Sequence, residues 1–439
     1  MQRHVSVRQG VLVVLASLIV ASCGLLTPPP PTPTPEPRVL RVYAVRDPSL
    51  ESVIEIISRE FRFSHPDVQV EFIYGNGDYS ELQSGAAAGN VPDVVWLVDV
   101  FAPALIDAEL IIDLEEFARG DGSVNLTDVH PTALELGSSR DRPGLYMIPV
   151  SLETVQMYYN RSLWERSGAP LPRDDWTWSD LIAACKRLQE AVSGVDCLSF
   201  SNFGLVNHTW WAYWLPWVRG AGGDILSADG AQSTLSSPRS IEGLQGYLDL
   251  WLKHKIAARP GAGRGDCFID QTCAAFFSVA GVAQRYREQI GDRFEWDVQV
   301  APAHPAGRFT GIATYGFAVT RASRDPQLAW DFVKTIIAPD TQRAIVNAYL
   351  GTPVLLSLRN DPTIAQLPAP PANMRAFISG SEAGIAPPRY PLACGSIYNG
   401  PVASAIGNAL DAAIREVASV EGAFAVADRQ IQTCLDANR

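Results

Sequence analysis

Charge is scarce in this sequence. Asp, Glu, Lys and Arg supply only 19% of the 439 residues, the formal net charge is -12, and no run of Lys and Arg follows the first residues. Nucleic-acid binding needs clustered cations against the phosphates, so this composition argues against a nucleic-acid partner. Beyond the N-terminal segment there is no stretch of about 18 apolar residues either, so no further segment is expected to span a membrane.

The motifs of common enzymes and metal sites are also missing. The sequence has no Gly-x-Ser-x-Gly elbow, no P-loop, no His-Glu-x-x-His and no Cys-x-x-Cys. Each of these would supply a nucleophile, a phosphate cradle or metal ligands. The adjacent carboxylates at 115–116 and 174–175 are poor acid/base pairs, because neighbouring helical residues do not face each other. We therefore expect no catalysis, no cofactor and no metal; a glycan-degrading enzyme is the weaker alternative.

The N-terminus has the pattern of an export signal. A basic start is followed by an apolar run over residues 11–20, which ends in Val-Ala-Ser-Cys at 20–23. Such a run is too short to span a bilayer, and small residues before a cysteine resemble the bacterial lipobox. This pattern predicts a lipoprotein signal peptide over residues 1–23 and lipidation of Cys23. The protein is then exported and lipid-anchored to the outer face of the cell membrane, in the periplasm or at the cell surface.

A proline-rich segment follows the predicted anchor. Residues 27–37 read TPPPPTPTPEP. Proline fixes φ and removes a backbone donor, so this stretch favours an extended polyproline II conformation. Residues 24–37 are therefore interpreted as a tether that holds the folded part away from a membrane.

Six cysteines remain after Cys23, and an even number in an exported chain suggests disulfides. Six cysteines allow 15 pairings. Proximity in sequence favours three pairs: Cys185–Cys197, Cys267–Cys273 and Cys394–Cys434.

Hydrophobic periodicity predicts alternating strands and helices. Strands are expected at 39–45, 68–74 and 94–98, with helices at 50–63 and 79–88 between them. This alternation favours a mostly parallel sheet covered by helices, with ligands at the carboxyl ends of strands. Further along, the pattern predicts strands at 296–300 and 316–320, and helices at 162–168, 179–192 (begun by Ser179), 210–217, 241–255, 326–338 and 402–436 (broken near Gly422).

Several short motifs occur in an order that resembles one family. They are VPDVVW at 91–96, the stretch 146–154 running into YYNRSLW at 158–164, WTWSDL at 176–181, residues 220–224, 315–320, AWDFVK at 329–334 and GTP at 351–353. Together with the lipobox, they resemble the extracellular solute-binding proteins of carbohydrate ABC importers, the family that includes maltose-binding protein. The resemblance covers about 38–439.

The resemblance implies an α/β, two-lobed periplasmic-binding-protein fold (type II) with a ligand cleft between the lobes. The first lobe is expected at 38–150 plus 302–350, and the second at 151–301 plus 351–439. The implied partners are a sugar or sugar-like solute and the transmembrane subunits of an ABC permease. The protein is expected to be a monomer. The alternative function is an extracellular carbohydrate sensor or adhesin without transport.

Sugar hydroxyls need charged or amide partners, and sugar C–H faces stack on aromatic rings. Asp99 follows a predicted strand, and Arg46 and Asp47 end another, so these three are candidate ligand contacts. Asp99 and Asp47 could equally cap the helices that follow them.

Other candidates come from the family positions. Glu153 lies where the chain should cross between lobes and matches a sugar-contacting Glu, although a solvated hinge carboxylate is the alternative. Trp211 aligns near a stacking aromatic, displaced from a core stripe of its helix. The remaining ligand candidates are Tyr398, Asn399, Tyr315 and Asn76. Val282 stands where the family pattern offers a stacking Trp, which puts maltose itself in doubt.

Overall fold

The computed structural model describes residues 38–75, 79, 82, 91–139, 142–201, 207–261, 265–362, 364–398 and 400–438. Residues 39–439 form one compact unit. The predicted signal peptide with Cys23, the tether, and nearly all of the predicted helix at 79–88 lie outside the described residues. Within the described part of the chain, no helix is both long and apolar enough to cross a membrane.

The first sheet has six strands, in the order β10-β9-β3-β1-β2, with β4 also paired to β9. Strand β1 is parallel to β3, whereas β9 runs antiparallel to both β3 and β4. The expected mostly parallel sheet is therefore a mixed one, because β9 returns in the opposite direction. The strands are β1 Arg38–Val45, β2 Val68–Gly75, β3 Val94–Val98, β4 Ile148–Thr154, β9 Thr310–Val319 and β10 Gly384–Ile385.

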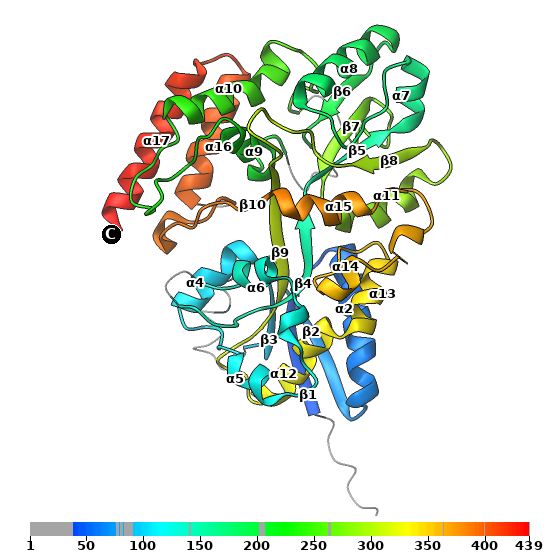
Figure 1. Cartoon of the computed structure of the whole chain (residues 1–439). Helices are drawn as coiled ribbons and strands as arrows, with labels where there is room; N and C mark the ends of the chain where they lie inside the picture. The colour runs from blue at the N-terminus through cyan, green and yellow to red at the C-terminus, as the bar shows by residue number, and fades with distance from the viewer. Residues whose placement is uncertain are drawn as a thin grey trace, which may run out of the picture. The chain divides into compact units, whose positions relative to one another are not determined.

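Helices pack around this sheet (Figure 1). They are α2 Pro48–Ser64, α4 Ala102–Asp107, α5 Glu115–Gly120, α6 Pro131–Leu136, α12 Pro326–Lys334, α13 Pro339–Asn347 and α14 Leu356–Arg359. Helix α2 begins where Asp47 accepts hydrogen bonds from the N–H groups of Ser49 and Leu50, both at 3.0 Å. The capping role foreseen for Asp47 is therefore confirmed.

The second sheet has four strands, in the order β6-β7-β5-β8. They are β5 Gln156–Asn160, β6 Asp196–Ser199, β7 Cys273–Ser278 and β8 Trp296–Gln299. The associated helices are α7 Arg161–Ser167, α8 Trp178–Ala191, α9 Trp211–Gly220, α10 Pro238–Leu252, α11 Ala283–Ile290, α15 Arg375–Ser379, α16 Gly400–Ile414 and α17 Val420–Ala437.

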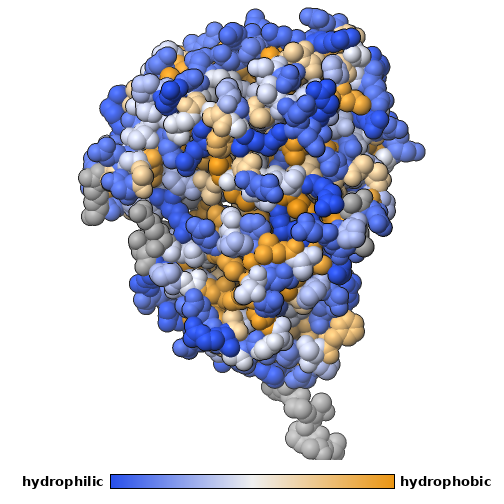
Figure 2. All heavy atoms as spheres, viewed as in Figure 1, coloured by the Kyte–Doolittle hydropathy of each residue, from blue (hydrophilic) through white to orange (hydrophobic). Residues whose placement is uncertain are grey.

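Strands β4 and β9 connect the two sheets (Figure 1). Only Val155 separates β4 of the first sheet from β5 of the second. Strand β9 pairs with β10 at its beginning and with β3 towards its end. Figure 2 shows hydrophobic residues gathered in the middle of the viewed face, at the level where these strands cross. The predicted lobe boundaries at 150, 301 and 350 stay predictions. Leu355 and Leu358, beyond residue 350, pack in the core of the first sheet.

Two helix boundaries differ from the sequence prediction. Helix α8 is capped by Thr177 in a capping box with Asp180, not by Ser179. The reason is that the Thr177 hydroxyl and the Asp180 carboxylate each accept the other's backbone N–H. The C-terminal helix breaks at residues 415–419, before Gly422, because Ser419 caps α17 and accepts the Gly422 N–H.

The three disulfides form as predicted, between Cys185 and Cys197, Cys267 and Cys273, and Cys394 and Cys434. The first ties α8 to β6, and the third ties residues 392–394 to α17.

Candidate functional site

Asp99 lies at the carboxyl end of β3, in the short 3-10 helix Asp99–Phe101. Its carboxylate accepts the N–H of Val100 at 2.8 Å and the N–H of Thr314, on β9, at 3.4 Å. The residue is 3% exposed. Burial raises the pKa of Asp99 to about 7, and the two hydrogen bonds and the nearby Arg389 oppose that rise. A carboxyl group that is half ionised near neutral pH is a strong hydrogen-bonding partner for a polar ligand.

Tyr398 lies beside the start of α9, where its hydroxyl feels the charge of Asp99. Burial of its hydroxyl, followed by the charge of Asp99, raises the pKa of Tyr398 to about 12. The residue as a whole is 40% exposed, so its ring still presents open surface. That ring lies 6.5 Å from the ring of Phe101, centroid to centroid. The pair forms an aromatic wall beside the carboxylate.

Two tryptophans at the start of α9 contribute to the same place. The Trp210 indole N–H donates to the Tyr398 hydroxyl at 3.3 Å. The indole of Trp211 also lowers the pKa of Tyr398 and so faces the same hydroxyl. Its N–H nevertheless lies outside hydrogen-bond geometry with every described residue. Trp211 is 1% exposed, whereas Trp210 is only half-buried. Trp211 was predicted as a stacking residue from its family position. In the structure, the ring of Trp210 is the more accessible of the two.

Glu153 lies on β4 where the chain crosses between the sheets. One carboxylate oxygen accepts the Ala280 N–H at 3.0 Å, and the other accepts the Ser151 hydroxyl. The N–H groups of Gly281 and Thr352 also stabilise its ionised form. Burial outweighs these hydrogen bonds and raises the pKa of Glu153. Glu153 is 6% exposed, so it is not the solvated hinge carboxylate considered as an alternative. Its hydrogen bonds join β4 to the segments around Ala280 and Thr352.

Of the remaining predicted residues, Tyr315 lies near Glu153 and Asp47. Tyr315, on β9, donates to the Leu350 carbonyl at 3.4 Å. Burial and the charges of Glu153 and Asp47 raise the pKa of Tyr315. Arg46 is exposed and lies over the Tyr74 ring at 4.2 Å. Asn76 and Asn399 lie outside the described residues.

Three residues near this site, Arg389, Phe101 and Trp210, were not predicted from the sequence. Arg389 belongs to an irregular APPRYP stretch with no periodicity that could place it. Phe101 sits two residues after Asp99, which is the one local signal that could have identified it. No group of three or more His, Cys, Asp or Glu side chains able to hold a metal ion occurs among residues of known placement.

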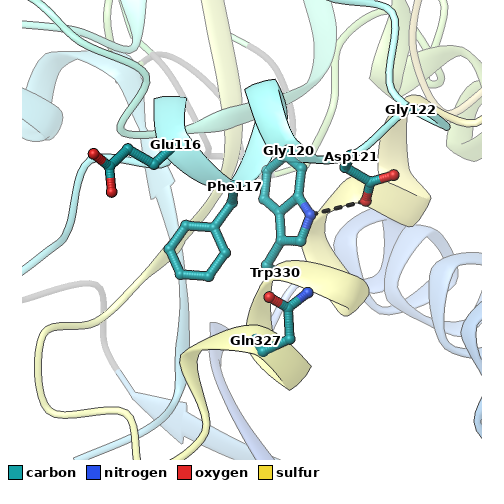
Figure 3. A pocket seen from close by; sticks show the side chains of 7 residues that line it. All are labelled: Glu116, Phe117, Gly120, Asp121, Gly122, Gln327 and Trp330. Carbon is teal, nitrogen blue, oxygen red and sulfur yellow. Dashed lines mark hydrogen bonds between the residues drawn. The ribbon is translucent and has the colours of Figure 1, made fainter.

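A separate pocket of about 430 Å³ lies between α5 and α12 (Figure 3). Its lining includes none of the predicted site residues. Asp121 accepts the Trp330 indole N–H at 3.1 Å and pairs with Lys334 at 2.8 Å, which lowers the pKa of Asp121. These partners join α5 to α12, so we interpret the cluster as structural.

Comparison with known proteins identifies the family. Residues 57–372 match the model of the bacterial extracellular solute-binding proteins. The chain belongs to this family. This solute-binding protein is similar to several curated relatives. An uncharacterized lipoprotein from Streptomyces antibioticus is 24% identical over 66% of this chain, and the match spans 64% of that relative's length. A maltooligosaccharide ABC transporter solute-binding lipoprotein from Streptococcus pneumoniae is 24% identical over 76% of each chain.

Solved structures confirm the fold. An ABC substrate-binding protein from Listeria monocytogenes, in complex with cycloalternan, superposes with a TM-score of 0.77 at 20% identity, over 91% of this chain and 99% of that one. A cyclic alpha-maltosyl-1,6-maltose binding protein from Arthrobacter globiformis has a TM-score of 0.75 at 19% identity, over 91% and 100%. The predicted two-lobed α/β fold is therefore confirmed. We call the body around the first sheet the first lobe and the body around the second sheet the second lobe.

Proposed function

We propose that this solute-binding protein captures a neutral sugar or short oligosaccharide outside the cell and delivers it to an ABC permease. The observation that carries the proposal is the partly open ring of Tyr398, 6.5 Å from the ring of Phe101, which shares a 3-10 helix with the buried Asp99 carboxylate. A hydrogen-bonding carboxylate beside an aromatic face suits a polyhydroxyl ring. The names of the relatives, which include maltooligosaccharide and cyclic maltosyl-maltose binders, support a sugar ligand.

The charges around the site favour a neutral ligand over a phosphorylated one. Asp99 and Glu153 are buried carboxyl groups. The charge of Arg389 acts on Asp99, and the Arg389 guanidinium donates to the backbone carbonyls of Glu135 and Leu136. An anionic ligand would therefore meet the negative charge of these two carboxyl groups. We propose further that the sugar is released chemically unchanged, and chromatography of the recovered sugar tests this part.

Substituting Asp99 with alanine should weaken the binding of maltotetraose about 10- to 100-fold, because a hydrogen bond to a charged group contributes roughly 1.5–3 kcal/mol. Calorimetric titration of residues 38–439 measures this change. At a maltotetraose concentration of 100 times the Kd, the free energy of unfolding of the wild-type protein should rise by about 2.7 kcal/mol. Asp107→Ala, at the exposed end of α4, is the matched control and should bind like wild type.

A panel of sugars and glycerol phosphates in the same thermal assay tests the ligand class. Stabilisation by phosphorylated compounds alone would contradict a neutral ligand. Equal affinity of Asp99→Ala and wild type would place the site elsewhere. Loss of sugar uptake in cells that lack the protein separates transport from a sensor or adhesin role.

Lipid anchoring at Cys23 is part of the same proposal and rests on the lipobox pattern and on the two relatives named as lipoproteins. Replacing Cys23 with serine should move the protein from the membrane fraction to the medium or leave it unprocessed, because the acylated thiol is gone. Membrane fractionation with an immunoblot measures this. An unchanged membrane-bound fraction would disprove the anchor.

A further inference from the structure

Residues 386–398 form a segment that touches both lobes; we call it the strap. In Figure 1 it is the orange chain beside β10, between α16 above and α4 with α6 below. Its attachment to the second lobe is covalent, through the disulfide between Cys394 and Cys434 of α17. The Tyr390 ring also packs against the core of that lobe. Residues 390–394 of the strap are therefore attached to the second lobe.

The strap contacts the first lobe at several places. At its beginning it leaves β10, which is paired to β9, and Ala386 packs against the core of the first lobe. The Arg389 guanidinium donates to the carbonyls of Glu135 and Leu136, at 3.1 and 3.3 Å. These carbonyls end α6, where a cation is favoured by the helix dipole and satisfies free acceptors. At the other end of the strap, Tyr398 lies against Phe101. The two contacts flank Asp99, whose charge acts on both Arg389 and Tyr398.

We propose that the strap is a latch across the ligand site, and that Arg389 is the positioning residue that holds it to α6 and sets the rate of solute release. The ligand part of this inference rests on the proposed function. The strap is fixed near its two ends, by β10 on β9 and by the disulfide to α17, so the polar Arg389 contact between them is the one that opens. Although Arg389 as a residue is exposed, its charged end is desolvated enough to lower its pKa, as expected for a group held against the protein.

The disulfide makes the latch effective. It joins residues 40 positions apart and, together with β10 on β9, keeps both ends of the strap fixed when the Arg389 contact is broken. Tethering raises the effective concentration of Arg389 at its acceptors, so the contact re-forms quickly. Removing the disulfide and removing the Arg389 side chain should therefore speed release by the same route, and the two effects should not add.

The test uses residues 38–439 of wild type, Arg389→Met, Arg389→Lys and the double variant Cys394→Ser/Cys434→Ser. Arg429→Met, on the exposed face of α17, is the control for loss of an arginine. Hydrogen exchange of the strap amides without ligand should rise about 10-fold in Arg389→Met, because local opening becomes easier. Stopped-flow tryptophan fluorescence should show maltotetraose leaving roughly 10-fold faster, with little change in the association rate. Arg389→Lys, which keeps a donor, should restore most of the slow release.

Unchanged exchange of the strap amides in Arg389→Met would overturn the latch, whatever the ligand. Faster exchange with an unchanged maltotetraose release rate would overturn its role in release. If wild type binds no sugar at all, the proposed function fails, and the exchange measurement still decides whether Arg389 holds the strap. If Arg389→Met and Arg429→Met changed strap exchange and the release rate equally, loss of a surface charge would explain both, and the proposal would be overturned.

Discussion

Replacing Trp211 with alanine should lower the free energy of unfolding by about 3–5 kcal/mol, because a fully buried Trp leaves a cavity when it is truncated. The side chain is 1% exposed in the core of the second lobe. Its ring also packs on Gly311 of β9, where an added Cβ would lie 3.3 Å from it. Urea unfolding monitored by circular dichroism measures the loss.

Two companion variants separate packing from ligand contact. Trp210→Ala removes a half-buried ring and should destabilise the fold by less than Trp211→Ala, while it weakens sugar binding by releasing the Tyr398 hydroxyl. Trp211→Phe retains most of the packing but removes the unpaired indole N–H. A sharp loss of affinity in Trp211→Phe, at nearly wild-type stability, would make Trp211 a ligand contact. A wild-type unfolding midpoint in Trp211→Ala would contradict its role in the core.

Acidification should destabilise this protein through His304 by about 3 kcal/mol between pH 6.5 and 4, at about 1.4 kcal/mol for each pKa unit. The His304 side chain is 5% exposed, and the Trp178 indole N–H donates to its Nε2 at 3.1 Å. Burial lowers the pKa of His304 to about 4. The unfolded chain takes up this proton near pH 6.5 and the folded chain only near pH 4, so folding stability is lost as the pH falls through that window.

The measurement is the free energy of unfolding of wild type and His304→Gln at pH 7, 5.5 and 4. The difference between the two proteins cancels the opposite contribution of Asp99, whose raised pKa favours the folded state as the pH falls from 7 to 3.8. Wild type should lose stability relative to His304→Gln on acidification, with a change in the fluorescence of Trp178 as its acceptor is protonated. Parallel pH profiles for both proteins would show that His304 does not titrate in this range.

Much of the local structure follows from the sequence alone. Apolar spacing predicted β1, α2, β2 and β3 to within a few residues, because strand and helix periods leave a direct trace in the residue pattern. Proximity along the chain also predicted the three disulfide pairings, since short loops close most easily. Asp99 could be placed at the end of a strand for the same local reason.

The tertiary structure alone decided how the site is assembled. Tyr398 lies against Phe101, and Arg389 donates to the end of α6, across sequence separations of more than 200 residues that no local pattern records. Glu153 is buried because segments around Ala280 and Thr352 converge on it, which depends on how β4 crosses between the lobes. The relative exposure of Trp210 and Trp211 was likewise set by the packing of α9 on β9, since a helix period identifies the faces of a helix but not what covers each one.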